Sequence, residues 1–160
     1  MFSVKTFKPL HLVLLFSIFA IIAAYFIQYI LGYQPCNLCL IERMPYILSI
    51  IIISLCLFSK KFERISLVIL SIIFFSASLI SLYHFGIEQG LIKESLVCDL
   101  TIKDDILTKE AILEQLKTKT KSCQDVAFKI FGLSLASINI IISLILSIIT
   151  IKLFLNYEKN

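Results

Sequence analysis

The chain has 160 residues, of which 59% are hydrophobic and only 16% are charged, and its mean hydropathy is +0.95. These values exclude an ordinary soluble domain and predict a protein embedded in lipid. The net charge of +4 is spread over several segments, so a nucleic-acid partner is not expected. The four glycines show no G-x-G-x-x-G spacing, so nucleotide cofactors are not expected either.

Four long stretches without Asp, Glu, Lys or Arg divide the chain. A helix needs roughly 20 residues to cross about 30 Å of hydrocarbon, and three of the stretches exceed that length. The second, residues 44–59, reaches it only if the helix starts near Cys39, which places Glu42 and Arg43 in its first turns. The first is longer than the roughly 7 to 15 apolar residues of a signal peptide, so we interpret it as a retained anchor. We predict one domain, residues 1–160, with membrane spans at about residues 10–31, 40–58, 65–85 and 129–151.

The expected fold class is an all-α integral membrane protein, a four-helix transmembrane bundle, because an unpaired backbone amide in lipid costs several kcal/mol. A long polar loop at about residues 86–128 separates the third and fourth spans. Within this loop, residues 103–117 carry apolar side chains at near-helical spacing, which predicts a short amphipathic helix. This helix could pack on the loop in solvent or lie on the membrane surface.

Charge and cysteine placement together predict the orientation in the membrane. Lys and Arg are concentrated in the short segments at both termini and at residues 59–64, which marks these segments as cytoplasmic, whereas the lysines of the long loop are mixed with Asp and Glu. Four of the five cysteines fall on the opposite side, where thiols form lasting disulfides. We therefore expect the following cysteines to be extracytoplasmic: Cys36, Cys39, Cys98 and Cys123.

The most informative segment, residues 34–46, contains Cys36 and Cys39 near the predicted start of the second span. Two cysteines separated by two residues at a helix start can form a readily reduced disulfide, and the helix N-terminus favours the thiolate. Arg43 follows Cys39 by one helical turn and can stabilise negative charge on its sulfur. Alternatively, Arg43 is an interfacial anchor that pairs with its acidic neighbour. Pro45 removes one helical hydrogen bond and predicts a bend that could open a pocket at the membrane surface.

Two structural roles compete with a redox role for Cys36 and Cys39: a static disulfide, or half of a zinc site. Zinc would require a second close cysteine pair or nearby histidines. The other two extracytoplasmic cysteines are far apart in the sequence, and His11 and His84 lie in or beside predicted spans. We therefore expect no metal site.

Cys98 and Cys123 lie in the polar loop, and a bond between them would stabilise it by roughly 3 to 4 kcal/mol on the loop-entropy estimate. Taken alone, this pair would be a structural staple. Together with Cys36 and Cys39 on the same side, it favours a relay of two disulfides, because thiol exchange needs one pair that faces partners and another that faces the electron acceptor.

Three further polar or reactive residues lie in predicted spans. Cys56 is in the middle of the second span, where a thiol behaves as a small buried hydrophobe. His84 ends the third span on the cysteine side and could carry protons or contact a quinone, although a histidine at an interface can also be merely half-buried. Asn139 in the last span is interpreted as an interhelical hydrogen-bonding group.

Three motifs resemble the DsbB family, the disulfide bond formation proteins of bacterial inner membranes. The most specific is C-x-L-C followed by E-R-x-P-Y at residues 36–46, and the others are Y-H-F-G-I-E at residues 83–88 and F-G-L-S-L-A at residues 131–136. The resemblance covers nearly the whole chain. The sequence departs from it at Glu42, where many members carry Gln, and in the lysine-rich loop that precedes Cys123.

The resemblance implies a role for each site residue. Cys36 and Cys39 would be the pair next to a quinone, either ubiquinone or menaquinone, with Cys39 as the thiolate that contacts the ring and Arg43 as the cation beside it. Cys98 would be attacked by the thiol of a partner, and Cys123 would be its disulfide mate.

The expected function is therefore the reoxidation of a periplasmic thioredoxin-fold thiol oxidase of the DsbA kind, with electrons passing to a membrane quinone. The expected location is a bacterial inner membrane, with both termini cytoplasmic and the redox cysteines periplasmic. One alternative is a thiol oxidoreductase similar to vitamin K epoxide reductase, in which the C-x-x-C motif opens a late span. Another is a non-catalytic membrane scaffold with a disulfide-stapled loop, which Arg43 beside Cys39 disfavours.

Overall fold

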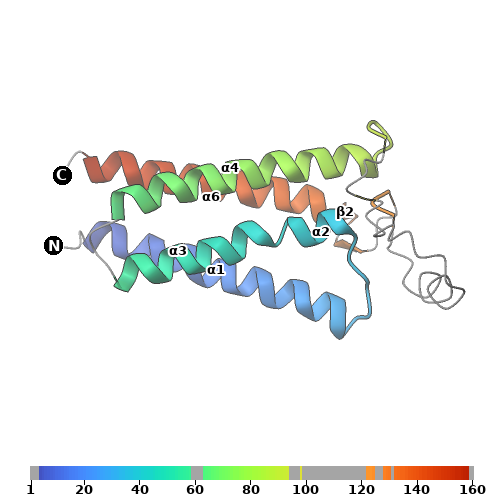
Figure 1. The fold of residues 1–160 in the computed structure, drawn as a ribbon, viewed down its shortest axis with the longest axis horizontal. Helices are drawn as coiled ribbons and strands as arrows, with labels where there is room; N and C mark the ends of the chain where they lie inside the picture. The colour runs from blue at the N-terminus through green and yellow to red at the C-terminus, as the bar shows by residue number, and fades with distance from the viewer. Residues whose placement is uncertain are drawn as a thin grey trace, which may run out of the picture.

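The computed structural model describes residues 4–58, 63–93, 98, 122–124, 128–130 and 132–158. Within this part of the chain, four helical segments are long and apolar enough to cross a membrane. They run side by side as one bundle, with the two termini at one end (Figure 1). The predicted fold class, an all-α membrane bundle, is confirmed. The predicted amphipathic helix at residues 103–117 lies outside the described residues.

The helices follow the chain in a simple order. The first segment is a single helix, the second combines a short helix with a longer one, and the third and fourth are single helices. Their bounds are α1 (Val4–Tyr29), α2 (Asn37–Ile41), α3 (Met44–Phe58), α4 (Glu63–Glu88) and α6 (Leu135–Glu158).

The second crossing is interrupted near its start, between α2 and α3. The amide of Glu42 still donates to the carbonyl of Leu38 at 2.9 Å, but that of Arg43 donates to the carbonyl of Leu40 at 3.2 Å, which tightens the last turn of α2. Pro45 then lies in the first turn of α3, where its missing N–H costs no helical hydrogen bond. The sequence predicted a bend here, and the interruption directs the side chain of Glu42 into the bundle, where it is buried.

The bundle core consists of apolar side chains in the middle of the helices together with small polar residues at the helix contacts. The largest fully buried side chain is Phe74 of α4, which packs with Tyr46 and Ile53 of α3. The most extensive contact is between α4 and α6, where Ser71 and Ser147 exchange hydrogen bonds. Small residues of this kind let two helices approach closely in a membrane.

The fourth crossing begins with a short hairpin. Strands β1 (Lys129–Ile130) and β2 (Leu133–Ser134) pair antiparallel, and Gly132 turns the chain with a φ of 83°. Helix α6 therefore starts at Leu135, later than the residue 129 expected from hydrophobicity. The hydroxyl oxygen of Ser134 accepts from the amide of Ser137 at 3.2 Å, which is the hydrogen bond of an N-cap.

Candidate functional site

Cys36 and Cys39 are at the end of the bundle opposite the termini, where α2 begins (Figure 1). Cys36 is the N-cap of α2, and its sulfur accepts a hydrogen bond from the amide of Cys39 at 3.3 Å. The two sulfurs lie 2.6 Å apart, and both residues are free thiols in this structure. Cys36 is buried, whereas Cys39 is partly exposed.

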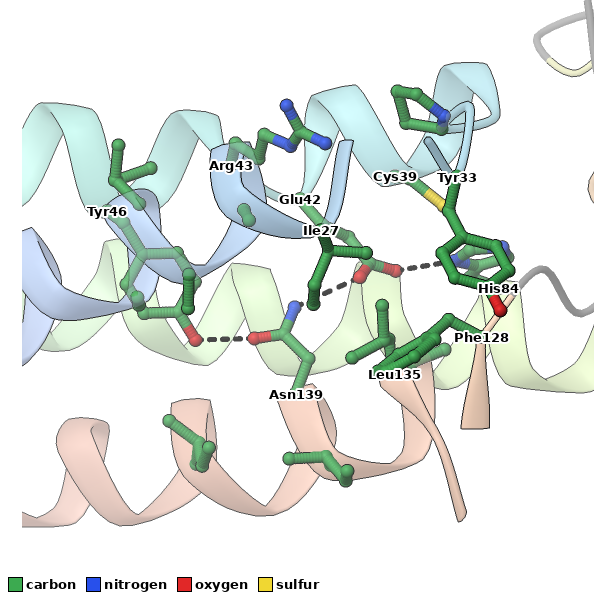
Figure 2. A pocket seen from close by; sticks show the side chains of 18 of the residues that line it. Ile27, Tyr33, Cys39, Glu42, Arg43, Tyr46, His84, Phe128, Leu135 and Asn139 are labelled. Atoms are coloured by element: carbon green, nitrogen blue, oxygen red, sulfur yellow. Dashed lines mark hydrogen bonds and ion pairs between the residues drawn. The ribbon is translucent and has the colours of Figure 1, made fainter. Parts of the chain in front are cut away.

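His84 of α4 approaches the same sulfur from the neighbouring helix. Its Nε2 atom lies 3.5 Å from Sγ of Cys36, and its Nδ1 atom lies 2.7 Å from Oε1 of Glu42 (Figure 2). The pKa of the Cys36 thiol is lowered, first by the hydrogen bond from Cys39 and then by the hydrogen bond and charge of His84, although burial opposes the shift. This cysteine is therefore poised to be a thiolate. The sequence placed His84 on the cysteine side, and the structure brings it into contact with Cys36.

Glu42 continues the polar network into the bundle. Its Oε2 atom accepts from Nδ2 of Asn139 at 3.1 Å, and the same Nδ2 atom donates to the hydroxyl of Ser81 at 2.8 Å. The hydroxyl of Tyr46 donates to Oδ1 of Asn139 (Figure 2). Asn139 is therefore an interhelical hydrogen-bonding group, as the sequence predicted. The sequence analysis missed the roles of Glu42 and Tyr46, although a carboxylate within an apolar span is itself a signal of function.

Arg43 points to the other side of the second crossing, toward α1. Its Nη1 atom donates to Oε1 of Gln28 at 2.6 Å, and its guanidinium carbon lies 5.3 Å from the centre of the Tyr25 ring. Glu42 pairs with His84 and Asn139, so it is not the partner that the anchor interpretation assigned to Arg43. The predicted effect of Arg43 on the sulfur of Cys39 stays a prediction.

A cavity of about 350 Å³ lies between these groups. Its wall is mostly apolar and comes from all five described helices, together with the connection that precedes α2 (Figure 2). Small-molecule sites commonly have this size and this apolar character, with a few polar groups that fix the orientation of the ligand. The polar or reactive groups in the wall include Cys39, Glu42, Arg43, His84 and Glu88.

The second cysteine pair is a disulfide between Cys98 and Cys123, whose Cα atoms are 5.8 Å apart. Both residues are buried, and they form one apolar cluster with Cys36, Leu38 and Ile87, against which Cys39 packs. The structure thus brings together all four cysteines that the sequence selected. Cys56 belongs to a different cluster and lies near the end of α3 instead of in the middle of its span; it is buried, as expected for an apolar thiol.

Three donor atoms at this site could hold a metal ion. The sulfurs of Cys36 and Cys39 and a ring nitrogen of His84 all lie within 4.8 Å of one another. The sequence analysis expected no metal because no histidine was known to lie near the cysteine pair. The tertiary structure removes that reason, because α4 carries His84 to the pair.

A four-helix membrane bundle with two cysteine pairs in one buried cluster defines a multi-pass membrane protein with a thiol–disulfide site. The family model described as Disulfide bond formation protein DsbB matches residues 8–153, so the chain belongs to the DsbB family. The uncharacterized protein RP370 of Rickettsia prowazekii (strain Madrid E) is 32% identical over 157 residues, which are 96% of this chain and 91% of that relative. No solved structure matches the chain significantly.

Membership of this family implies a disulfide oxidoreductase activity and a thiol oxidase partner of the DsbA kind. The resemblance inferred from the motifs is confirmed.

Proposed function

We propose that this protein is a quinone-dependent thiol oxidase that reoxidises a periplasmic thioredoxin-fold oxidase of the DsbA kind. The observation that carries the proposal is the packing of the Cys98–Cys123 disulfide against Cys36, next to a cavity whose wall includes Cys39. Thiol exchange requires sulfur atoms that can reach one another, and this cluster supplies them.

In the first exchange, a thiolate of the partner attacks Sγ of Cys98, which breaks the Cys98–Cys123 bond and releases Cys123 as a thiolate. The second thiol of the partner then attacks the mixed disulfide, so that the partner leaves oxidised. Cys98 and Cys123 are left reduced and have taken up two electrons.

In the second exchange, Cys123 attacks Cys36, and Cys39 leaves as a thiolate. Cys98 then attacks the new bond at Cys123, which restores the Cys98–Cys123 disulfide and leaves Cys36 and Cys39 as the reduced pair. Cys36 suits this position because it packs against the loop disulfide and because its pKa is lowered, which makes it a good leaving group.

The cavity fits the head group of a quinone by its size and by its donor set. Its apolar wall suits a flat ring, whereas Arg43 and His84 offer N–H groups to carbonyl oxygens. Cys39 would face the ring. A bound quinone would accept two electrons and two protons from the thiol pair.

The proposed location is a bacterial inner membrane, with both termini in the cytoplasm and the cysteine cluster on the periplasmic side. Two features support it. Lys and Arg are concentrated in the terminal segments and at residues 59–64, and the termini and the cysteine pair are at opposite ends of the bundle (Figure 1).

The test uses purified full-length protein in lipid nanodiscs with ubiquinone or menaquinone and a reduced thioredoxin-fold partner. We expect one quinone to be reduced for each pair of partner thiols oxidised, and the absorbance of the quinone measures this reduction. Cys39→Ala should abolish turnover, whereas Cys56→Ala should retain it. If the partner were oxidised at the same rate without quinone, quinone would not be the electron acceptor. If no thiols were oxidised with either quinone, the result would favour the non-catalytic scaffold.

A further inference from the structure

We propose that the reduced form of this protein binds one thiophilic d¹⁰ cation of the Zn²⁺ class through Cys36, Cys39 and His84. Thiolate and imidazole are the ligands that Zn²⁺ prefers among protein side chains. The inference requires only that the cysteine pair can be reduced. Its failure would therefore leave the proposed oxidase function untouched.

One pair of donor atoms, on Cys36 and His84, has the spacing that a tetrahedral ion needs. With Zn–S about 2.3 Å and Zn–N about 2.0 Å, a sulfur and a nitrogen bound to one ion are roughly 3.5 Å apart. The distance from Sγ of Cys36 to Nε2 of His84 is 3.5 Å. The two sulfurs are 2.6 Å apart, so the side chain of Cys39 must rotate outward to make room for the ion. The cavity beside Cys39 provides space for this rotation.

His84 is held in the orientation of a metal ligand. Metal-binding histidines usually donate their second ring N–H to a carboxylate, which fixes the tautomer. Here Oε1 of Glu42 lies 2.7 Å from Nδ1, and Glu42 is in turn held by Asn139 at 3.1 Å. A carboxylate accepts hydrogen bonds, so Nδ1 keeps its hydrogen, and Nε2 would lose its proton when the ion binds and would then present a lone pair on the side of Cys36.

A fourth donor is available in Glu88, at the end of α4. Its Oε1 atom is 3.9 Å from Nε2 of His84, and its side chain is only 6% exposed. Its Oε2 atom is buried and has no hydrogen-bond partner among the described residues. A buried carboxylate oxygen without a partner is costly unless it meets a cation or a proton. A bound ion would complete its coordination with Glu88 and satisfy this group.

The site is gated by the redox state of the pair. Coordination displaces two protons from the group formed by Cys36, Cys39 and His84 in favour of one divalent cation, and no electrons move. The disulfide form of Cys36 and Cys39 lacks the thiolates and is not expected to bind. An ion on the reduced pair would keep it reduced and would prevent it from passing its two electrons to an acceptor.

The experiment uses full-length protein in nanodiscs, reduced with a phosphine under anaerobic conditions and titrated with Co²⁺. We expect a thiolate-to-cobalt band and visible d–d bands of a tetrahedral site, saturating at one Co²⁺ per protein and disappearing when Zn²⁺ is added. Protein with both disulfides formed should show neither band. Equal binding by the oxidised protein, or a reduced protein without the thiolate band, would overturn the proposal.

Variants identify the ligands. Cys36→Ser should remove the thiolate-to-cobalt band or weaken it strongly. The double variant Cys98→Ser with Cys123→Ser should leave the band in place.

Glu42→Gln should weaken Co²⁺ binding by about 10- to 100-fold, as changes to a residue that holds a metal ligand in place typically do. His84→Ala should weaken binding at least as much, whereas His11→Ala, at the only other histidine, should not. A Co²⁺ affinity unchanged in folded His84→Ala would overturn the assignment of His84. Because Glu88→Gln keeps the shape of the side chain, altered d–d bands in that variant would test the fourth ligand even if the His84 variant fails to fold.

Discussion

The two sulfurs of the C-x-x-C pair have different surroundings, and this difference assigns different roles to them. Cys36 is buried, contacts His84 and packs in one cluster with Cys98 and Cys123. Cys39 is partly exposed and lies in the wall of the cavity. In the proposed function, the buried sulfur would exchange with the loop disulfide, and the other sulfur would face the quinone.

The order of exchange predicts the behaviour of Cys98→Ala. This variant should form no mixed disulfide with the partner, because the attacked sulfur is missing, while Cys36 and Cys39 should still be oxidised by quinone. Non-reducing gels of the partner mixture and thiol counting after quinone addition measure the two effects. Cys123→Ala is the matched control: when both variants are mixed with the partner in its disulfide form, the free thiol of Cys98 in Cys123→Ala should attack that disulfide and form the mixed disulfide. Trapping retained in Cys98→Ala would contradict the assigned order.

Arg43 contacts α1 through Gln28 and Tyr25 and also lines the cavity. If its charge holds the acceptor, Arg43→Ala should raise the apparent KM for quinone by about tenfold or more, since a hydrogen bond to a charged group contributes roughly 1.5 to 3 kcal/mol. The measurement is a quinone titration at saturating partner. Arg64→Ala, at the opposite end of the bundle, is the control. An unchanged KM in Arg43→Ala would restore the anchor interpretation.

At the scale of elements, the site depends on how three helices meet. The break between α2 and α3 directs Glu42 inward, α4 presents His84 and Ser81, and α6 presents Asn139. Asn139 joins all three, because it hydrogen-bonds Glu42, Ser81 and Tyr46. The network is therefore part of the packing of the bundle as well as of the site.

Asn139→Leu should destabilise the bundle by about 1 to 3 kcal/mol, because it removes the hydrogen bond to the buried Oε2 atom of Glu42 and the amide oxygen that accepts from the Tyr46 hydroxyl. Unfolding in mixed detergent, followed by circular dichroism, measures the loss. Ser76→Ala is a suitable control, since Ser76 is exposed and its hydroxyl donates to the carbonyl of Ile72 in its own helix. A loss no larger than that of Ser76→Ala would show that the network contributes little to stability.

At the scale of the whole molecule, the bundle separates its two ends chemically. The terminal ends of α1 and α6 lie together, and the cysteine cluster lies at the far end (Figure 1). This arrangement allows thiol chemistry on one side of a membrane while the opposite, basic end fixes the orientation.

Labelling with a membrane-impermeant thiol reagent tests this arrangement in intact cells. After reduction, single-cysteine variants that retain only Cys98 or only Cys123 should react from outside. A cysteine added at either end of the chain should react only after the cells are permeabilised. Cys56 should be unreactive in both cases because it lies within an apolar helix long enough to cross the membrane, where a membrane-impermeant reagent does not reach it. The cysteine cluster and the termini reacting from the same side would refute the proposed topology.

The sequence by itself determined the features that depend on local composition. Apolar length set the number of crossings, and spacing identified the C-x-x-C motif, because each of these is a property of neighbouring residues. The orientation that the density of lysine and arginine indicates stays a prediction. The start of the fourth helix was placed too early, since an apolar run does not reveal that Gly132 makes a turn and that Ser134 caps the helix.

Only the tertiary structure decided which distant residues meet at the site. The contacts of His84 with Cys36 and of Asn139 with Glu42 join residues 48 and 97 positions apart. Such contacts depend on the rotation and depth of each helix relative to its neighbours. Side-chain packing between helices sets these quantities, and the hydrophobic pattern of a single helix leaves them open.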